Sequence, residues 1–209
     1  MDEKLYQHYF DALIKGDKAT CNEIIMDLLD KDVDIRTIYI DLFQRSLYQV
    51  GELWERNKIS VATEHLATAI TEGLLGLLYP RVFGAEHNGK KAVVSCAVNE
   101  YHQIGGKMVA DIFEINGWDS HFLGANTPLD SLLEHIQEFQ PDVLALSLSM
   151  YSNLPKLLKT TDTIRGNYLH LDIVFGGQAF RWGGQDDMLK ILRTQYFPSL
   201  IDFENSLKP

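Results

Sequence analysis

The sequence has 209 residues, of which 45% are hydrophobic and 23% charged, as in folded chains with one large domain or two small ones. The net charge of −10 argues against a broad surface for nucleic acid or anionic lipid, so neither is expected as a direct partner. The two cysteines, Cys21 and Cys96, lie far apart in the sequence, which disfavours a disulfide framework. The N-terminus does not resemble a signal peptide, and no apolar stretch is long enough to span a membrane. These features favour a cytoplasmic protein.

Residues 1–84 have apolar side chains at helical spacing throughout. Gly16 is typical of a helix end, whereas Asp34 and Ser60 are favourable N-caps. Helices are expected over about 6–16, 20–32, 34–57 and from 60 to near Pro80. Four helices with short loops predict an antiparallel four-helix bundle that acts as a cap.

Residues 90–209 alternate between buried-strand runs and helical segments, after a linker at 84–90. Strands are predicted at 91–98, 119–124, 141–150 and 170–177, with a last one near 197–203. Helices are predicted at 106–117, 128–139, 153–167 and 185–195. This alternation predicts an α/β fold with a doubly wound parallel sheet, Rossmann-like in its flavodoxin-like form.

The loops at the carboxyl ends of these strands, where doubly wound sheets bind ligands, carry unusual residues. They are Glu100, His102, Gly105 and Gly106, then Ser147 and Ser149, then Gly176 and Gly177. Taken singly, each has an ordinary interpretation as a loop histidine, a solvated carboxylate, a strand-end serine or a turn glycine. Their occurrence together favours a binding site, and the missing GxGxxG spacing disfavours a phosphate cradle.

The Glu-x-His-x-x-Gly spacing suits a metal-ligating imidazole. Such a ring coordinates through one nitrogen and donates its other N–H to a carboxylate, here Glu100 directly or through a relay. Gly105 would allow a sharp turn beside a bulky group, and Gly176 and Gly177 would allow close approach of a long ligand tail. One histidine, His102, is too few for zinc but suits a corrin or a haem.

The segments Glu100–Gly105, Ser147–Ser149 and Gly176-Gly177 resemble the cobalamin-binding domain in its base-off, histidine-on form. The resemblance implies that His102 is the lower axial cobalt ligand and that Glu100 tunes it. The family has Asp where this chain has Glu100, so direct pairing with His102 stays open. The implied cofactor-binding residues of this half are Glu100, His102, Gln103, Ile104, Gly105, Gly124, Ser147, Ser149, Gly176 and Gly177.

The helical half carries Trp54, nine further residues and then Glu64-His65, a pattern that resembles the cap of CarH/LitR-type light sensors. These sensors bind adenosylcobalamin, and the resemblance implies that Trp54 packs over the adenosyl group while Glu64 and His65 contact it. Read separately, Trp54 suits a bundle core and Glu64 a helix start. Small residues farther along leave room for a macrocycle or for a packed helix: Thr68, Ala69, Gly73 and Gly76.

Two features depart from those sensors. Members with a DNA-bound dark state carry a winged-helix domain ahead of the cap, for which this sequence has no room. Some members place a cobalt-ligating histidine beside the cap tryptophan, where this chain has Glu55, so His65 or water is left for the upper face after light.

The expectation is a stand-alone light sensor, not an enzyme, that binds adenosylcobalamin between cap and sheet domain and signals through photolysis of the cobalt–carbon bond. Its output would reach a partner protein or change self-association. The alternative is a corrinoid carrier for a methyltransferase system, with methylcobalamin or hydroxocobalamin in place of the adenosyl form. A third possibility is that the fold serves haem or a partner protein.

Overall fold

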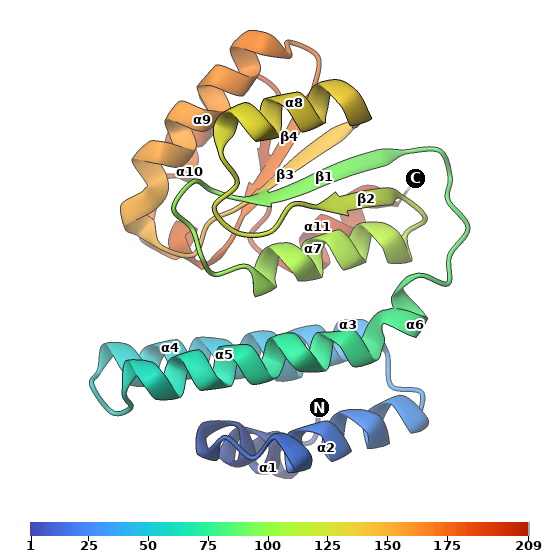
Figure 1. Ribbon diagram of the computed structural model, residues 1–209, viewed down its shortest axis with the longest axis vertical. Helices are drawn as coiled ribbons and strands as arrows, with labels where there is room; N and C mark the ends of the chain where they lie inside the picture. The colour runs from blue at the N-terminus through green and yellow to red at the C-terminus, as the bar shows by residue number, and fades with distance from the viewer. Residues whose placement is uncertain (209) are drawn as a thin grey trace. The chain divides into compact units, whose positions relative to one another are not determined.

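The computed structural model describes residues 1–208, which divide between Phe83 and Gly84 into two compact units. We call them the helical unit (1–83) and the sheet unit (84–208). Figure 1 shows the helices of the first and the layered sheet of the second. No helix in the described part of the chain is both long and apolar enough to cross a membrane.

The helical unit has four helical stretches, as predicted. Asp34 and Ser60 cap the third and fourth with their side chains, and Gly16 ends the first in a left-handed conformation with a φ of 75°. Large buried side chains, among them Tyr9, Tyr39 and Phe43, fill the core. The elements are α1 (Glu3–Lys15), α2 (Lys18–Asp30), α3 (Ile35–Thr37), the π-helical η1 (Ile38–Gln44), α4 (Arg45–Glu55), α5 (Val61–Leu75), the 3₁₀ turn η2 (Gly76–Leu78) and α6 (Tyr79–Val82).

Two details of this unit differ from the prediction. The third stretch is one continuous path, α3-η1-α4, but its middle is π-helical rather than α-helical. The fourth stretch was expected to stop near Pro80 and instead continues to Val82. Pro80 is tolerated because the 3₁₀ turn η2 precedes it, so Pro80 stands in the first turn of α6, where its missing N–H is not needed.

The sheet unit has five strands, all parallel, in the order β2-β1-β3-β4-β5. This is the flavodoxin-like order, so the predicted fold class is confirmed. The strands are β1 (Lys91–Cys96), β2 (Asp119–Phe122), β3 (Val143–Ser147), β4 (Asp172–Gly176) and β5 (Thr194–Tyr196).

Helices cover both faces of this sheet (Figure 1). Phe113 of α7 and Phe203 of α11 pack together with Ala92 and Val94 of β1 on one face. On the other face α8, α9 and α10 pack against the alternate side chains of β1, β3 and β4. The helical elements are α7 (Ile104–Ile115), α8 (Leu129–Phe139), η3 (Tyr151–Asn153), α9 (Leu154–Asn167), η4 (Gln178–Trp182), α10 (Gln185–Met188) and α11 (Leu200–Leu207).

The C-terminal elements differ most from the prediction. Helix α10 ends at Met188 instead of reaching 195, and the last strand is 194–196 rather than 197–203. The predicted strand segment instead leads into α11, because the Ser199 side chain accepts a hydrogen bond from the Asp202 N–H and caps a helix there. Phe203 is buried by this helix, which explains the apolar run.

Strand order reverses between β1 and β3, since β2 lies to one side of β1 and β3 to the other. The loops that follow β1 and β3 therefore flank the crevice in which such sheets bind ligands. Those two loops contain Glu100, His102 and Ser149.

Candidate functional site

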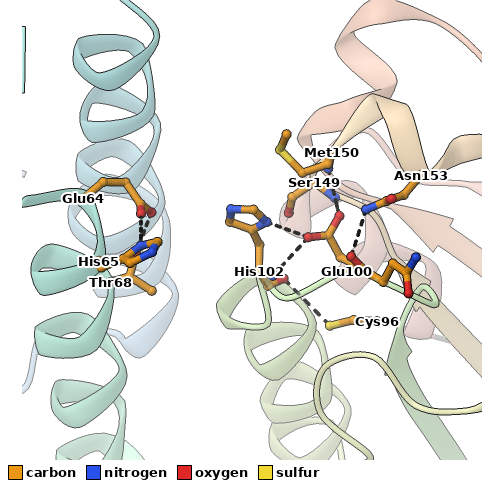
Figure 2. A network of polar contacts seen from close by, with 10 residues as sticks. Glu64, His65, Thr68, Cys96, Glu100, His102, Ser149, Met150 and Asn153 are labelled. Atoms are coloured by element: carbon orange, nitrogen blue, oxygen red, sulfur yellow. Dashed lines mark hydrogen bonds and ion pairs between the residues drawn. The ribbon is translucent and has the colours of Figure 1, made fainter. Parts of the chain in front are cut away.

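Glu100 is a fully buried carboxylate that four donors hold in place. Its Oε1 accepts hydrogen bonds from the His102 ring Nδ1 at 2.6 Å and from the His102 backbone N–H at 3.0 Å. Its Oε2 accepts from the backbone N–H groups of Ser149 at 2.9 Å and Met150 at 2.8 Å (Figure 2). Glu100 therefore joins the loops after β1 and β3, and it pairs with His102 directly, without a relay.

The electrostatics of Glu100 follow from these contacts. Burial is the largest influence and would raise the pKa of the carboxyl, because it removes water from the charged form. The hydrogen bonds from the His102 ring and from the backbone of Met150, His102 and Ser149 outweigh burial and lower the pKa to about 2. A fixed carboxylate charge thus stands behind the His102 imidazole.

The His102 side chain is 46% exposed although its partner is wholly buried. With Nδ1 on Glu100, the ring is oriented so that Nε2 is the nitrogen for a metal, which is the arrangement of carboxylate–histidine–metal sites. Its carbonyl faces the Cys96 thiol, whose Sγ lies 3.8 Å away. Within residues 1–208, no group of three or more histidine, cysteine or acidic side chains could hold a metal ion. This donor set fits a cofactor that needs a single axial imidazole from the protein.

The glycines near His102 lie in a helix rather than in a sharp turn. Helix α7 begins at Ile104, two residues earlier than predicted, so Gly105 and Gly106 belong to its first turn. A Cβ on Gly106 would lie 3.1 Å from the Phe122 ring and 3.3 Å from Cys96 Sγ. A Cβ on Gly105 would make ordinary contact with the Ser147 hydroxyl at 3.7 Å. Gly106 therefore lets α7 begin close against Phe122 and Cys96, whereas the position of Gly105 has room for a Cβ.

Gly176 and Gly177 are explained by the chain's own backbone. A Cβ on Gly177, whose φ is 119°, would fall 2.1 Å from the carbonyl oxygen of Leu148. A Cβ on Gly176 would fall 2.8 Å from the carbonyl oxygen of Phe197. Both positions exclude a side chain whether or not a ligand is bound, so their role toward a cofactor stays a prediction.

The remaining predicted residues of the sheet unit lie at the same strand ends. Ser147 ends β3 and is buried, and Ser149 contributes its backbone N–H to Glu100. Gln103 is the N-cap residue of α7, and Ile104 after it is buried. Gly124 follows β2 with a φ of 79°, and its carbonyl accepts from Cys96.

In the helical unit, Glu64 and His65 form a braced pair in the first turns of α5. His65 Nδ1 lies 2.6 Å from Glu64 Oε2, and the Thr68 hydroxyl donates to Glu64 Oε1 at 3.0 Å (Figure 2). Glu64 is largely covered, whereas the His65 side chain is 74% exposed. Trp54, near the end of α4, is 39% exposed and thus not a core residue of the bundle.

The sequence motifs did not predict the backbone donors of Ser149 and Met150, because every residue except proline carries a backbone N–H group. The small residues after His65 were predicted to leave room for a macrocycle or for a packed helix, and Gly73 in α5 and Gly76 in η2 are both exposed. A Cβ on Gly73 or Gly76 would meet no atom within 4 Å, so these glycines are not explained by packing inside the bundle.

Comparison with protein families gives two matches of the same description, B12 binding domain. One covers residues 90–188 and the other residues 5–79. The chain belongs to the B12-binding protein family. Cobalamin binding, which the Glu-x-His-x-x-Gly residues predict, is thereby supported for both parts of the chain.

Curated relatives of this B12-binding chain carry two kinds of name. The HTH-type transcriptional repressor CarA of Myxococcus xanthus is 30% identical over 69% of this chain and 48% of CarA. The dimethylamine corrinoid protein of Methanosarcina barkeri is 24% identical over 73% of this chain and 72% of the relative. Dimethylamine corrinoid protein 1 of Methanosarcina acetivorans is 28% identical over 51% of each chain. The chain spans about half the length of CarA and of this last relative. None of these names denotes an enzyme.

Among solved structures, the monomethylamine corrinoid protein of Methanosarcina barkeri has a TM-score of 0.83 at 16% identity and covers 99% of this chain and 98% of its own. A cobalamin-binding protein from Desulfitobacterium hafniense has a TM-score of 0.51 at 19% identity over 95% and 94%. At these identities the likeness shows the fold alone.

Proposed function

We propose that this B12-binding protein is a light sensor that carries adenosylcobalamin and passes its signal to a partner protein or to a second copy of itself. The observation that carries the proposal is the Glu64-His65 pair, braced by Thr68 at the start of α5, with exposed Trp54 ahead of it. The same pattern is the one that resembles CarH/LitR-type sensors, and the similarity to CarA supports it.

In this proposal His102 is the lower axial ligand. Glu100 holds the ring through Nδ1 and keeps its own negative charge, which increases the basicity of the coordinating nitrogen. The helical unit serves the upper face, where Trp54 packs on the adenosyl group and Glu64 with His65 hydrogen-bonds it.

When bound, adenosylcobalamin supplies a cobalt–carbon bond that light breaks. Trp54, Glu64 and His65 are the residues that would contact the adenosyl group in the dark and would lose this contact after light. A ligand shifts a conformational equilibrium only by contacts that differ between the two states, and these are the contacts that would differ. Water or His65 would then occupy the upper cobalt position.

The test is the absorption spectrum of the adenosylcobalamin complex in the dark and after green light. We expect a change that is absent from a dark control, together with a light-dependent change in sedimentation or in partner binding. Trp54→Ala should lower affinity for adenosylcobalamin relative to methylcobalamin. Trp182→Ala, which removes another exposed tryptophan, is the matched control. A complex whose spectrum stays unchanged under light contradicts the sensor proposal.

A second candidate is a corrinoid carrier for methyl transfer. The relatives named dimethylamine corrinoid proteins favour it, since one of them aligns over 73% of this chain. A carrier needs an upper face that a methyltransferase can reach, so it should prefer methylcobalamin and tolerate Trp54→Ala. Transfer of the methyl group to a thiol by an added methyltransferase would decide for the carrier.

A further inference from the structure

Three asparagines link the loops that follow the first three strands. Asn99 follows β1, Asn126 follows β2, and Asn153 ends η3 after β3. None of them belongs to the Glu-x-His-x-x-Gly, serine or diglycine motifs. Asn99 belongs to the stretch of backbone at 99–100 that leads into His102, and Asn126 and Asn153 both bond to that stretch.

Asn126 holds this stretch from two sides. Its side-chain Oδ1 accepts a hydrogen bond from the Asn99 N–H at 2.8 Å, and its own N–H donates to the Glu100 carbonyl at 3.0 Å. Asn153 adds a third bond, from its side-chain Nδ2 to the Asn99 carbonyl at 3.1 Å. Figure 2 shows Asn153 beside Glu100.

The backbone geometry explains why asparagine serves here. Asn99 has a φ of 66° and Asn126 a φ of 50°, both in the left-handed region that most side chains avoid. Asparagine enters this region more readily than other non-glycine residues and also offers an amide oxygen as acceptor. Glycine would keep the conformation without the oxygen, and aspartate would keep the oxygen.

The position of His102 depends on this stretch. Its ring and its backbone N–H both bond Glu100, whose carboxylate is fixed by the N–H groups of Ser149 and Met150. Residues 97–103 belong to no helix or strand, so their backbone conformation depends on hydrogen bonds from neighbouring loops. A metal–imidazole bond of about 2 Å tolerates little displacement of the ring.

We propose that Asn126 is a positioning residue that aims His102 at cobalt, with Asn153 as its support. This inference rests on the proposed role of His102 as the lower ligand. Without the Asn126 amide oxygen, the segment at 99–102 must be ordered when cobalamin binds, and affinity falls by the cost of that ordering.

The test uses the full chain, labelled uniformly with ¹⁵N and loaded with cob(II)alamin. In its electron paramagnetic resonance spectrum, an axial nitrogen from the protein splits each line into a doublet, whereas the unlabelled base of the cofactor gives a triplet. Asn126→Gly should weaken the doublet and lower cobalamin affinity about tenfold, the lower end for partners of metal ligands. Asn126→Asp should restore both. Asn167→Ala, which removes a side-chain bond to the Thr163 carbonyl at the end of α9, is the matched control and should leave both unchanged.

Full doublet intensity and unchanged affinity in Asn126→Gly overturn the inference, even if the melting temperature drops, because a purely structural role would give that result. An Asn126→Asp variant as impaired as Asn126→Gly overturns it as well, since the oxygen is then not what matters. A wild-type spectrum without the doublet overturns the ligand role of His102 itself, and this inference with it.

Discussion

At the scale of single residues, the side chain of Glu100, one methylene longer than the aspartate usual in the cobalamin-binding pattern, holds the site together. It reaches the His102 ring, the His102 backbone and two N–H groups beyond β3 at once. The spacing predicted Glu100 as a carboxylate partner for His102 and left open whether it reaches the ring directly, which the structure shows that it does. The backbone partners, and the asparagines that fix the loop, could not be predicted, because main-chain donors and left-handed turns depend on how distant strands are placed.

The first prediction concerns the charge on Glu100. Glu100→Gln keeps the shape but offers one acceptor oxygen and an NH₂ group to four donors, so a buried donor loses its partner. We expect the free energy of unfolding to fall by about 2 kcal/mol, as for hydrogen bonds to a charged group. Urea denaturation followed by circular dichroism measures it. Glu138→Gln, at an exposed position of α8, serves as control, and equal stability of the two variants would contradict the prediction.

The same carboxyl predicts a pH dependence. Its pKa is about 2 in the folded chain against an ordinary 4.5, because hydrogen bonds from His102 and the backbone outweigh burial. A lowered folded pKa stabilises the fold fully above pH 4.5 and loses this effect as the pH falls from 4.5 toward 2.

Stability measured across that range should therefore decline more steeply for the wild type than for Glu100→Gln. The gap between their urea midpoints should narrow as the solution is acidified. Parallel curves would mean that Glu100 does not titrate in this range.

At the scale of elements, features that depend on local side chains could be predicted from the sequence, whereas features that depend on packing could not. Asp34 and Ser60 cap their helices as predicted, since a cap needs only its own next turn. The π-helical stretch Ile38–Gln44 has no marker in the sequence. The last strand was placed too late because the apolar run around Phe203 suits a helix equally well, although Ser199 and Asp202 mark a helix start.

Gly177 gives the prediction at this scale. Gly177→Ala would place a Cβ against the Leu148 carbonyl in a backbone conformation, φ 119°, that alanine rarely adopts. We expect the free energy of unfolding to fall by roughly 3 kcal/mol or more, or the variant to fail to fold. A Cβ on Gly166 in α9 would meet no neighbour within 4 Å, so Gly166→Ala should raise the free energy of unfolding by about 0.5–1 kcal/mol. Thermal melts of both variants, without cofactor, test the contrast, and a Gly177→Ala protein as stable as wild type would refute it.

At the scale of the whole molecule, the α/β class and the parallel sheet followed from the alternation of strands and helices. The switch in strand order between β1 and β3 then explains why residues from separate motifs meet. Glu100 and Ser149 are adjacent in space although they are 49 positions apart. The division into units lies between Phe83 and Gly84, within the stretch that neither family match covers.

The last prediction concerns the connection between the units. Residues 83–87 are exposed and lie outside helices and strands, which is the usual setting for proteolytic nicking. Brief digestion of the cofactor-free chain with subtilisin should cut there first and leave two fragments, which mass spectrometry would identify. If one corrin is held by residues of both units, as we propose, added adenosylcobalamin should slow this cut, because a ligand that residues of both units bind stabilises the uncut chain. His102→Ala and Trp54→Ala should each reduce the protection. Cofactor that binds with full affinity and leaves the cutting rate unchanged would show that the helical unit takes no part in holding it.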